Sequence, residues 1–179
     1  MVIVSEIEFI TWSHNSHLKW TDFKAEPNPG VFEDSHSVIK YGFTWLVNSE
    51  KLNEEIVYFV DNIQISVNFN PLLSWVRHSE ATNNLLHHEQ GHFNLAELIK
   101  RKHDKIFTNK FNEKFFSTRG QNDAQRKQFA KEDSGRMISN EIDKLTKILS
   151  SKRDEYDVET DFGKKLEIQS KYDKLFETL

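Results

Sequence analysis

The sequence predicts an α+β fold in which an N-terminal antiparallel β-sheet is followed by a helical half. Two observations lead to this prediction. Residues 1–78 carry the apolar and polar alternation typical of strands, and from about Ser79 onward apolar residues recur at three- and four-residue steps. Because strands come first and helices afterwards, we expect a single domain over residues 1–179, β-rich over 1–78 and helical over 79–179.

The clearest strand signal lies at residues 63–69, where an apolar side chain occupies every second position. Residues 38–47 and 56–60 are also expected to form strands because they are rich in β-branched and aromatic residues. Asn28-Pro29-Gly30 is typical of a turn, and Asn70-Pro71 ends the strand before it.

Three helices are expected in the second half. The buried side of the first is marked by Leu85, Leu86, Phe93, Leu95, Leu98 and Ile99, and the segment 117–122 interrupts it. A second helix carries Ile138, Ile142, Leu145 and Leu149 on one face. The last helix follows Gly163 and is expected to point Leu166, Tyr172, Leu175 and Phe176 inward.

Composition excludes several classes of function. The 179 residues contain no cysteine, so a disulfide framework, a thiolate zinc finger, an iron–sulfur cluster and a cysteine nucleophile are excluded. No run of about 18 apolar residues is present, so we expect no membrane partner. The net charge of −4 is too small to indicate nucleic acid. The basic run at 100–102 is typical of a solvated helix face, so we expect no nucleic-acid partner.

The first residues bear on location. Met1–Val4 are apolar, but Glu6 and Glu8 follow at once and no basic residue precedes them. A secretory signal needs a positive start, an unbroken apolar stretch of roughly 7 or more residues and small residues for cleavage. The pattern predicts either a protein that stays in the cytoplasm or a chain whose leader has been removed.

The segment from Leu85 to Glu97 contains the motif His88-Glu89-x-x-His92. On a helix, residues four apart lie on one face with Cβ atoms roughly 5–6 Å apart, so two imidazoles at this spacing can bind one Zn²⁺. Glu89 can then act as the general base that takes a proton from the metal-activated water. The spacing therefore predicts a metallopeptidase site, although three fixed residues also recur by chance in unrelated helices.

A catalytic zinc takes three protein ligands plus water, and the third ligand is not part of this motif. His103 lies roughly 16 Å from His92 along the helix axis, and Glu97 faces away. The acidic cluster 154–159 is therefore the best supplier, with His78 and Glu141 behind it. The alternative for that cluster is a solvated turn between two helices.

Tyr156 lies within the same acidic cluster. A phenol beside a zinc site can donate a hydrogen bond to the oxyanion that forms during peptide hydrolysis. The ordinary alternative is a half-buried tyrosine near a helix end.

The run from His88 to Glu97 resembles the core of a bacterial family described as secreted zinc-dependent proteases, domain of unknown function 922. The resemblance extends upstream to residues 18–24 and 74–76, and downstream to Tyr156-Asp157-Val158-Glu159-Thr160. Together these segments cover most of the chain from about residue 15. The family is described as secreted, which this chain's lack of a leader does not match.

This resemblance implies a zincin-like domain with one zinc ion per chain, His88 and His92 as ligands and Glu89 as base. In the family the downstream segment continues Thr-x-His-Gly, whereas this chain has Phe162 at the histidine position. An acidic residue at 157–159 would then complete the coordination, and we assign Glu159, with Asp157 as the other candidate.

The leading prediction is a zinc-dependent metallopeptidase acting on a peptide or protein substrate, with Glu89 and Tyr156 as its catalytic residues. The alternative is a catalytically degenerate zincin-like binding module without turnover, which the departure at Phe162 favours.

Overall fold

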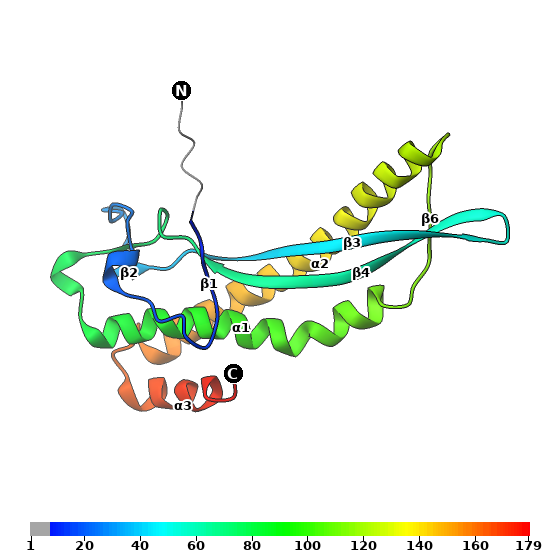
Figure 1. Ribbon diagram of the computed structural model, residues 1–179. Helices are drawn as coiled ribbons and strands as arrows, with labels where there is room; N and C mark the ends of the chain where they lie inside the picture. Colours follow the sequence, from blue (N-terminus) through cyan, green and yellow to red (C-terminus); the bar gives the residue numbers. More distant parts are fainter. Residues whose placement is uncertain (1–7) are drawn as a thin grey trace, which may run out of the picture.

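The structure is a computed structural model that describes residues 8–179 (Figure 1). It confirms the predicted α+β fold, with antiparallel sheets in the N-terminal part followed by three helices in the described range. The elements in chain order are β1 Ile10–Thr11, a 3-10 turn Trp20–Asp22, β2 Ser35–His36, β3 Ile39–Leu52, β4 Glu55–Phe69, β5 Trp75–Val76, a 3-10 turn His78–Glu80, α1 Asn83–Phe111, β6 Phe116–Ser117, α2 Asp123–Thr160 and α3 Leu166–Phe176. Residues 1–7, which the sequence analysis assigned to the β-rich half, lie outside this description.

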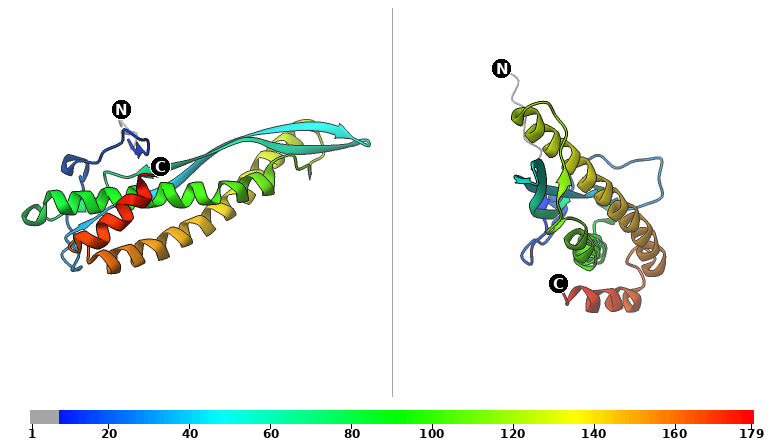
Figure 2. Two further views of the ribbon diagram at one scale, coloured as in Figure 1. Left: turned by 90° about the horizontal axis from the view of Figure 1, so that it is seen from below. Right: turned by 90° about the vertical axis from the view of Figure 1, so that its right-hand side faces the viewer.

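Strands β3 and β4 form a long antiparallel ribbon that projects beyond the ends of the helices (Figures 1 and 2). Their pairing runs from Ile39 opposite Phe69 to Leu52 opposite Glu55. The two residues between the strands, Asn53 and Glu54, have φ of 49° and 67°. A two-residue hairpin of type I′ needs positive φ at both positions, and its twist matches that of the strands.

The sequence analysis treated 56–60 and 63–69 as separate strands, whereas the structure joins them into β4. Asn62 has φ of 48°, and the register shifts between Thr44 and Leu46 of the partner strand. One extra residue on β4 is thus absorbed as a β-bulge, which bends the strand without ending it.

Short strands complete the two sheets. Strand β1 pairs with the C-terminal end of β4, and β6 pairs with β4 at Val57 and Tyr58. Strand β6 lies in the half that was predicted to be helical, so that half is not purely helical. A second sheet pairs β2 with β5, and β2 lies against α1.

Helices α1 and α2 begin at side-chain caps. The hydroxyl of Thr82 accepts a hydrogen bond from the Leu85 N–H at 3.2 Å, and the Asn122 side chain accepts one from the Gln125 N–H at 3.0 Å. The predicted interruption is confirmed, because the segment between Phe111 and Asp123 is not helical.

Helix α1 packs on β4, α2 packs on β3, and α3 lies against both helices (Figure 2). The core between these layers includes Val67, Phe69, Phe93, Ala96, Ile138, Leu145 and Tyr156. Within the described residues, no helix is both long enough and apolar enough to cross a membrane.

Two of the side chains expected to point inward from α3 do not. Leu166 and Leu175 are 58% and 49% exposed, whereas Phe176 is buried. Helix α3 buries the face that carries Gln169 and Phe176 against α1 and α2. No other described layer covers its opposite face, where apolar side chains stay in solvent.

Candidate metal centre

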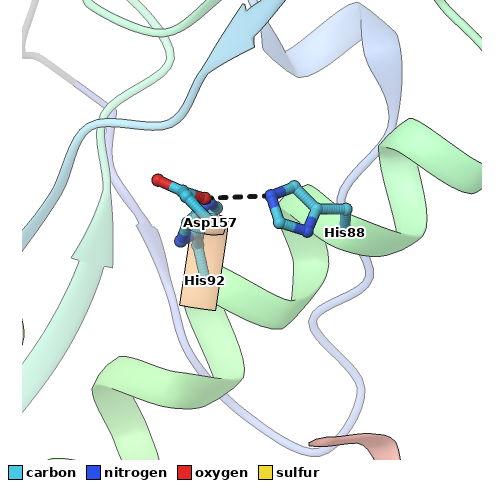
Figure 3. Close-up of side chains that lie close together, drawn as sticks. All are labelled: His88, His92 and Asp157. Atoms are coloured by element: carbon cyan, nitrogen blue, oxygen red, sulfur yellow. Dashed lines mark hydrogen bonds and ion pairs between the residues drawn. The ribbon is translucent and has the colours of Figure 1, made fainter. Parts of the chain in front are cut away.

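The two histidines of the motif lie one helical turn apart on α1, and Asp157 reaches them from the last turn of α2. Asp157 Oδ1 is 3.0 Å from His88 Nε2 and 2.9 Å from His92 Nε2. Figure 3 shows the three side chains pointing toward one another. The histidines are 1% and 3% exposed, and the three potential ligand atoms lie within 4.8 Å of one another. This buried group can hold a metal ion.

The orientation of His88 is fixed by a closed set of contacts beneath it. The ring of Tyr156 stacks on the imidazole, with centroids 4.6 Å apart and planes 7° apart. Gln169 Nε2 donates to Tyr156 Oη at 2.8 Å, and Oη donates to the His88 carbonyl oxygen at 3.2 Å. His88 Nδ1 lies 3.3 Å from Gln169 Oε1. Because Nδ1 of His88 is held by Gln169, Nε2 of the same ring faces Asp157. A histidine that binds a metal through one ring nitrogen commonly has its other nitrogen held by a hydrogen bond in this way.

Two glycines permit this close approach. A Cβ on Gly91 would lie 2.0 Å from Tyr156 Oη, and a Cβ on Gly163 would lie 2.7 Å from the Cβ of His88. Gly163 also has φ of 81°, a conformation that glycine adopts without strain. At these two positions the backbone therefore lies closer to Tyr156 and to His88 than a residue with a Cβ atom would allow.

Glu89 is buried on the side of α1 that meets β2. The Ser35 hydroxyl donates to Glu89 Oε1 at 2.5 Å, and the Ser37 hydroxyl donates to Oε2. Burial raises the pKa of Glu89, but His92, Arg153 and the two serine hydroxyls outweigh it, so the pKa lies below its usual value. The carboxylate is ionised at neutral pH and can accept a proton from a neighbouring group.

Arg153 lies one helical turn before Asp157, and its Nη1 donates to the Ser37 carbonyl oxygen. Burial raises the pKa of Asp157, but its hydrogen bonds with His88 and His92 and the charge of Arg153 outweigh this effect, so the pKa lies below its usual value. Burial, followed by the charge of Arg153, lowers the pKa of His92 to about 4. At neutral pH the centre thus contains an ionised carboxylate and a neutral His92, the protonation states that bind metals.

The atoms that face one another in this group match the metal that the motif implies. Two imidazole nitrogens and one carboxylate oxygen suit Zn²⁺ and other first-row divalent ions. His92 Nδ1 is buried without a hydrogen-bond partner in the described chain. Because Nε2 is the nitrogen that faces Asp157, the fit to a metal ion depends on Nε2 of both histidines and on Asp157 Oδ1, and not on this Nδ1. The residues therefore fit a metal ion.

Asp157 lies beside His88 and His92, whereas Glu159 does not contact either histidine. Glu159 is exposed and accepts a hydrogen bond from the Tyr172 hydroxyl at 2.6 Å. Two residues along a helix correspond to a rotation of about 200°, so Asp157 and Glu159 point in nearly opposite directions. The cluster 154–159 is also part of α2 and is not a turn between helices.

Tyr156 does not lie where an oxyanion donor would have to lie. It is fully buried, and its hydroxyl is held between the His88 carbonyl and Gln169. Burial raises its pKa far above the usual value. Its single proton is already donated, so Tyr156 positions His88 and does not face a substrate.

The other two candidate ligands, and Phe162 at the position of the family histidine, lie outside the described metal-binding group. His78 is exposed in the 3-10 turn before α1. Glu141 is buried in α2 at a position before Asp157 in the chain, where it pairs with Lys110 and Lys144. Phe162 is 40% exposed just after α2. None of these three side chains belongs to the described metal-binding group.

Sequence reasoning missed Ser35, Ser37, Arg153 and Gln169. Ser35 lies in the two-residue strand β2 and Ser37 directly after it, and a stretch this short has no periodic signal. Arg153 had a detectable signal, because residues 153, 156, 157 and 160 follow the spacing of one helix face.

No family model, no curated protein and no solved structure matches this chain. The resemblance to the family of zinc-dependent proteases therefore stays a prediction.

Proposed function

We propose that this protein is a zinc-dependent metallopeptidase that hydrolyses peptide bonds. The observation that carries the proposal is the buried group His88, His92 and Asp157, with the ionised Glu89 on the same turn of α1. Other metals suit two imidazoles and a carboxylate, but a glutamate directly after the first histidine is the arrangement used in zinc peptidases.

His88, His92 and Asp157 would hold the ion, and a catalytic zinc with three protein ligands binds water in addition. A zinc ion bound there would supply a Lewis acid for the substrate carbonyl and would lower the pKa of water. Glu89 takes a proton from the attacking water and returns it to the departing amine. The water oxygen forms a bond to the carbonyl carbon, and the carbon–nitrogen bond breaks.

The alternative of a binding module without turnover rested on Phe162. Asp157 offers a third ligand that does not require a histidine at that position. This supports an enzyme over a degenerate scaffold, and it means that substitution of Phe162 should leave the metal content unchanged.

The first experiment is the metal content of protein purified without a tag or chelator. We expect about one zinc ion per chain, the stoichiometry of a single site, and its loss in His92→Ala and Asp157→Asn. His103→Ala is the matched control, because His103 lies on α1 with its Nδ1 next to the Ile99 carbonyl oxygen. No metal in the wild-type protein after addition of zinc would contradict the proposal.

The second experiment tests the role of Glu89 with a mixed peptide library. Glu89→Gln should retain zinc and lose hydrolysis by about 10²–10⁴-fold, the usual contribution of a general base. Full hydrolysis by this variant would refute the mechanism. Zinc binding without hydrolysis by the wild-type protein would favour the binding module.

A further inference from the structure

A small cavity opens beside the proposed metal centre. Its volume is about 210 Å³, and His92 and Arg153 line it together with the apolar side chains of Val38, Ile39 and Leu149. A larger hollow of about 590 Å³ lies between β4 and α1, but no residue of the metal-binding group lines it. The smaller cavity is therefore the one from which a ligand can reach His92.

Arg153 is the charged side chain among the described residues that line this cavity. Its Nη1 donates to the Ser37 carbonyl, and its Nη2 lies 3.5 Å from His36 Nδ1. These contacts hold the guanidinium in place and leave other N–H groups without partners in the described chain. A planar guanidinium with free donors is well suited to bind a carboxylate.

His92 lines the same cavity next to Arg153, so a ligand held there lies beside a proposed metal ligand. The Nδ1 of His92 is buried from solvent, so it offers no donor to a ligand in the open cavity. Arg153 thus supplies the donors, and a carboxylate supplies two oxygen atoms for its free N–H groups.

The charges agree with this requirement. Arg153 gives the lining of the cavity, beside the proposed metal centre, a positive charge. Such a lining favours a ligand with a negative charge. No aspartate or glutamate is among the described residues that line the cavity.

We infer that Arg153 binds the terminal carboxylate of a peptide substrate, and that the protein removes a single apolar residue from the carboxyl end of a peptide. The cavity is smaller than the roughly 300–1,000 Å³ typical of sites for drug-sized ligands, so it fits one residue. Val38, Ile39 and Leu149 provide the apolar wall for its side chain. The inference rests on the proposed peptidase function. Water adds hydroxide to the carbonyl carbon and a proton to the amino group of the released residue.

The test compares the binding of two ligands that differ in the terminal group and contain no peptide bond, leucine and leucinamide, and it follows hydrolysis separately on N-acetyl-alanyl-leucine and its carboxamide. Isothermal titration of zinc-loaded protein should show at least about tenfold tighter binding of the acid, within the range for charge-assisted hydrogen bonds. Arg153→Gln should abolish this preference, and Arg153→Lys should retain part of it. Arg126→Gln is the matched control, because Arg126 lies on α2 and pairs with Asp123.

Equal affinity of the wild-type protein for acid and amide would overturn the inference, and this comparison does not depend on any variant being folded. An unchanged preference in Arg153→Gln would also overturn it. The proposed function fails separately: a preference for the acid without hydrolysis of either peptide would retain the Arg153 site and reject the peptidase. Equal hydrolysis of both peptides would retain the peptidase and reject the inference.

Discussion

Gly91, inside the histidine motif, lies so close to Tyr156 that α1 has no room there for a larger residue. In Gly91→Ala the new Cβ would meet Tyr156 Oη at 2.0 Å and Cζ at 2.8 Å. Because Tyr156 is fully buried, its ring has to shift, and overpacking of this kind costs about 1–3 kcal/mol. Urea unfolding should show this loss, and the zinc affinity should fall because the ring supports His88.

A double-mutant cycle separates this clash from other effects of the substitution. Tyr156→Phe removes the atom that is closest to the new Cβ, so Gly91→Ala should cost less in the Tyr156→Phe background than in the wild-type protein. Gly30→Ala is the control, because its Cβ would lie 3.3 Å from Asn28 Oδ1. Strictly additive losses in the cycle would refute the proposed contact.

For single residues, the sequence predicts which side chains could take part in the site better than it predicts which way each side chain points. The four-residue spacing is sufficient to bring His88 and His92 together, because both lie on one continuous helix. The choice between Asp157 and Glu159 depends on how α2 is rotated against α1, and an acidic cluster has residues on every face. Tyr156 was identified as part of the site, but its burial beneath His88 follows from tertiary packing alone.

Helices α1 and α2 are joined by an ion pair at some distance from the metal centre. Glu141 of α2 is 7% exposed and accepts hydrogen bonds from Lys110 of α1 and from Lys144. These bonds lower the pKa of Glu141 below its usual value, with Lys110 the largest cause. The pair therefore stabilises the fold above about pH 4.3, the usual pKa of glutamate, and this contribution is lost as the pH falls through the lowered pKa.

Glu141→Gln should lower the free energy of unfolding by about 1–3 kcal/mol at pH 7, the range for hydrogen bonds to charged groups. The difference from the wild-type protein should shrink below pH 4, as the wild-type carboxylate becomes protonated. Urea unfolding at a series of pH values measures both effects. Glu132→Gln, an exposed position on α2, is the control. A difference that does not change with pH would contradict the assignment.

The elements themselves were largely predictable, with instructive exceptions. Alternation identified residues 63–69 of β4 and composition identified 56–60, but neither signal shows that the two are one strand, which continues through a bulge at Asn62. Strand β6 has two residues and depends on its pairing with β4, so no local pattern indicates it. Periodicity identified the face of α2 that packs on the core, whereas α3 is too short for its periodicity to show which apolar residues stay exposed.

The whole molecule should respond to metal, because the ligands come from two helices that contact each other in the folded state. Zinc at 100 times its dissociation constant should stabilise the fold by about 2.7 kcal/mol. For a chain of this size the corresponding rise in Tm is about 5–10 °C. Differential scanning calorimetry with and without zinc measures the rise.

His92→Ala should show no rise in Tm on addition of zinc, whatever its own starting stability. His103→Ala should show the full rise. Equal shifts in His92→Ala and the wild-type protein would mean that zinc binds elsewhere.

The chain separation of the metal-binding residues has a consequence for folding kinetics. The β3–β4 ribbon closes over a turn of two residues, whereas His88 and Asp157 are 69 residues apart in the chain. Local pairing forms early, and contacts between distant residues form late because their loop-closure entropy is larger. Interactions made after the transition state slow unfolding and leave the folding rate almost unchanged. An ion held by His88, His92 and Asp157 would thus lengthen the lifetime of the native state.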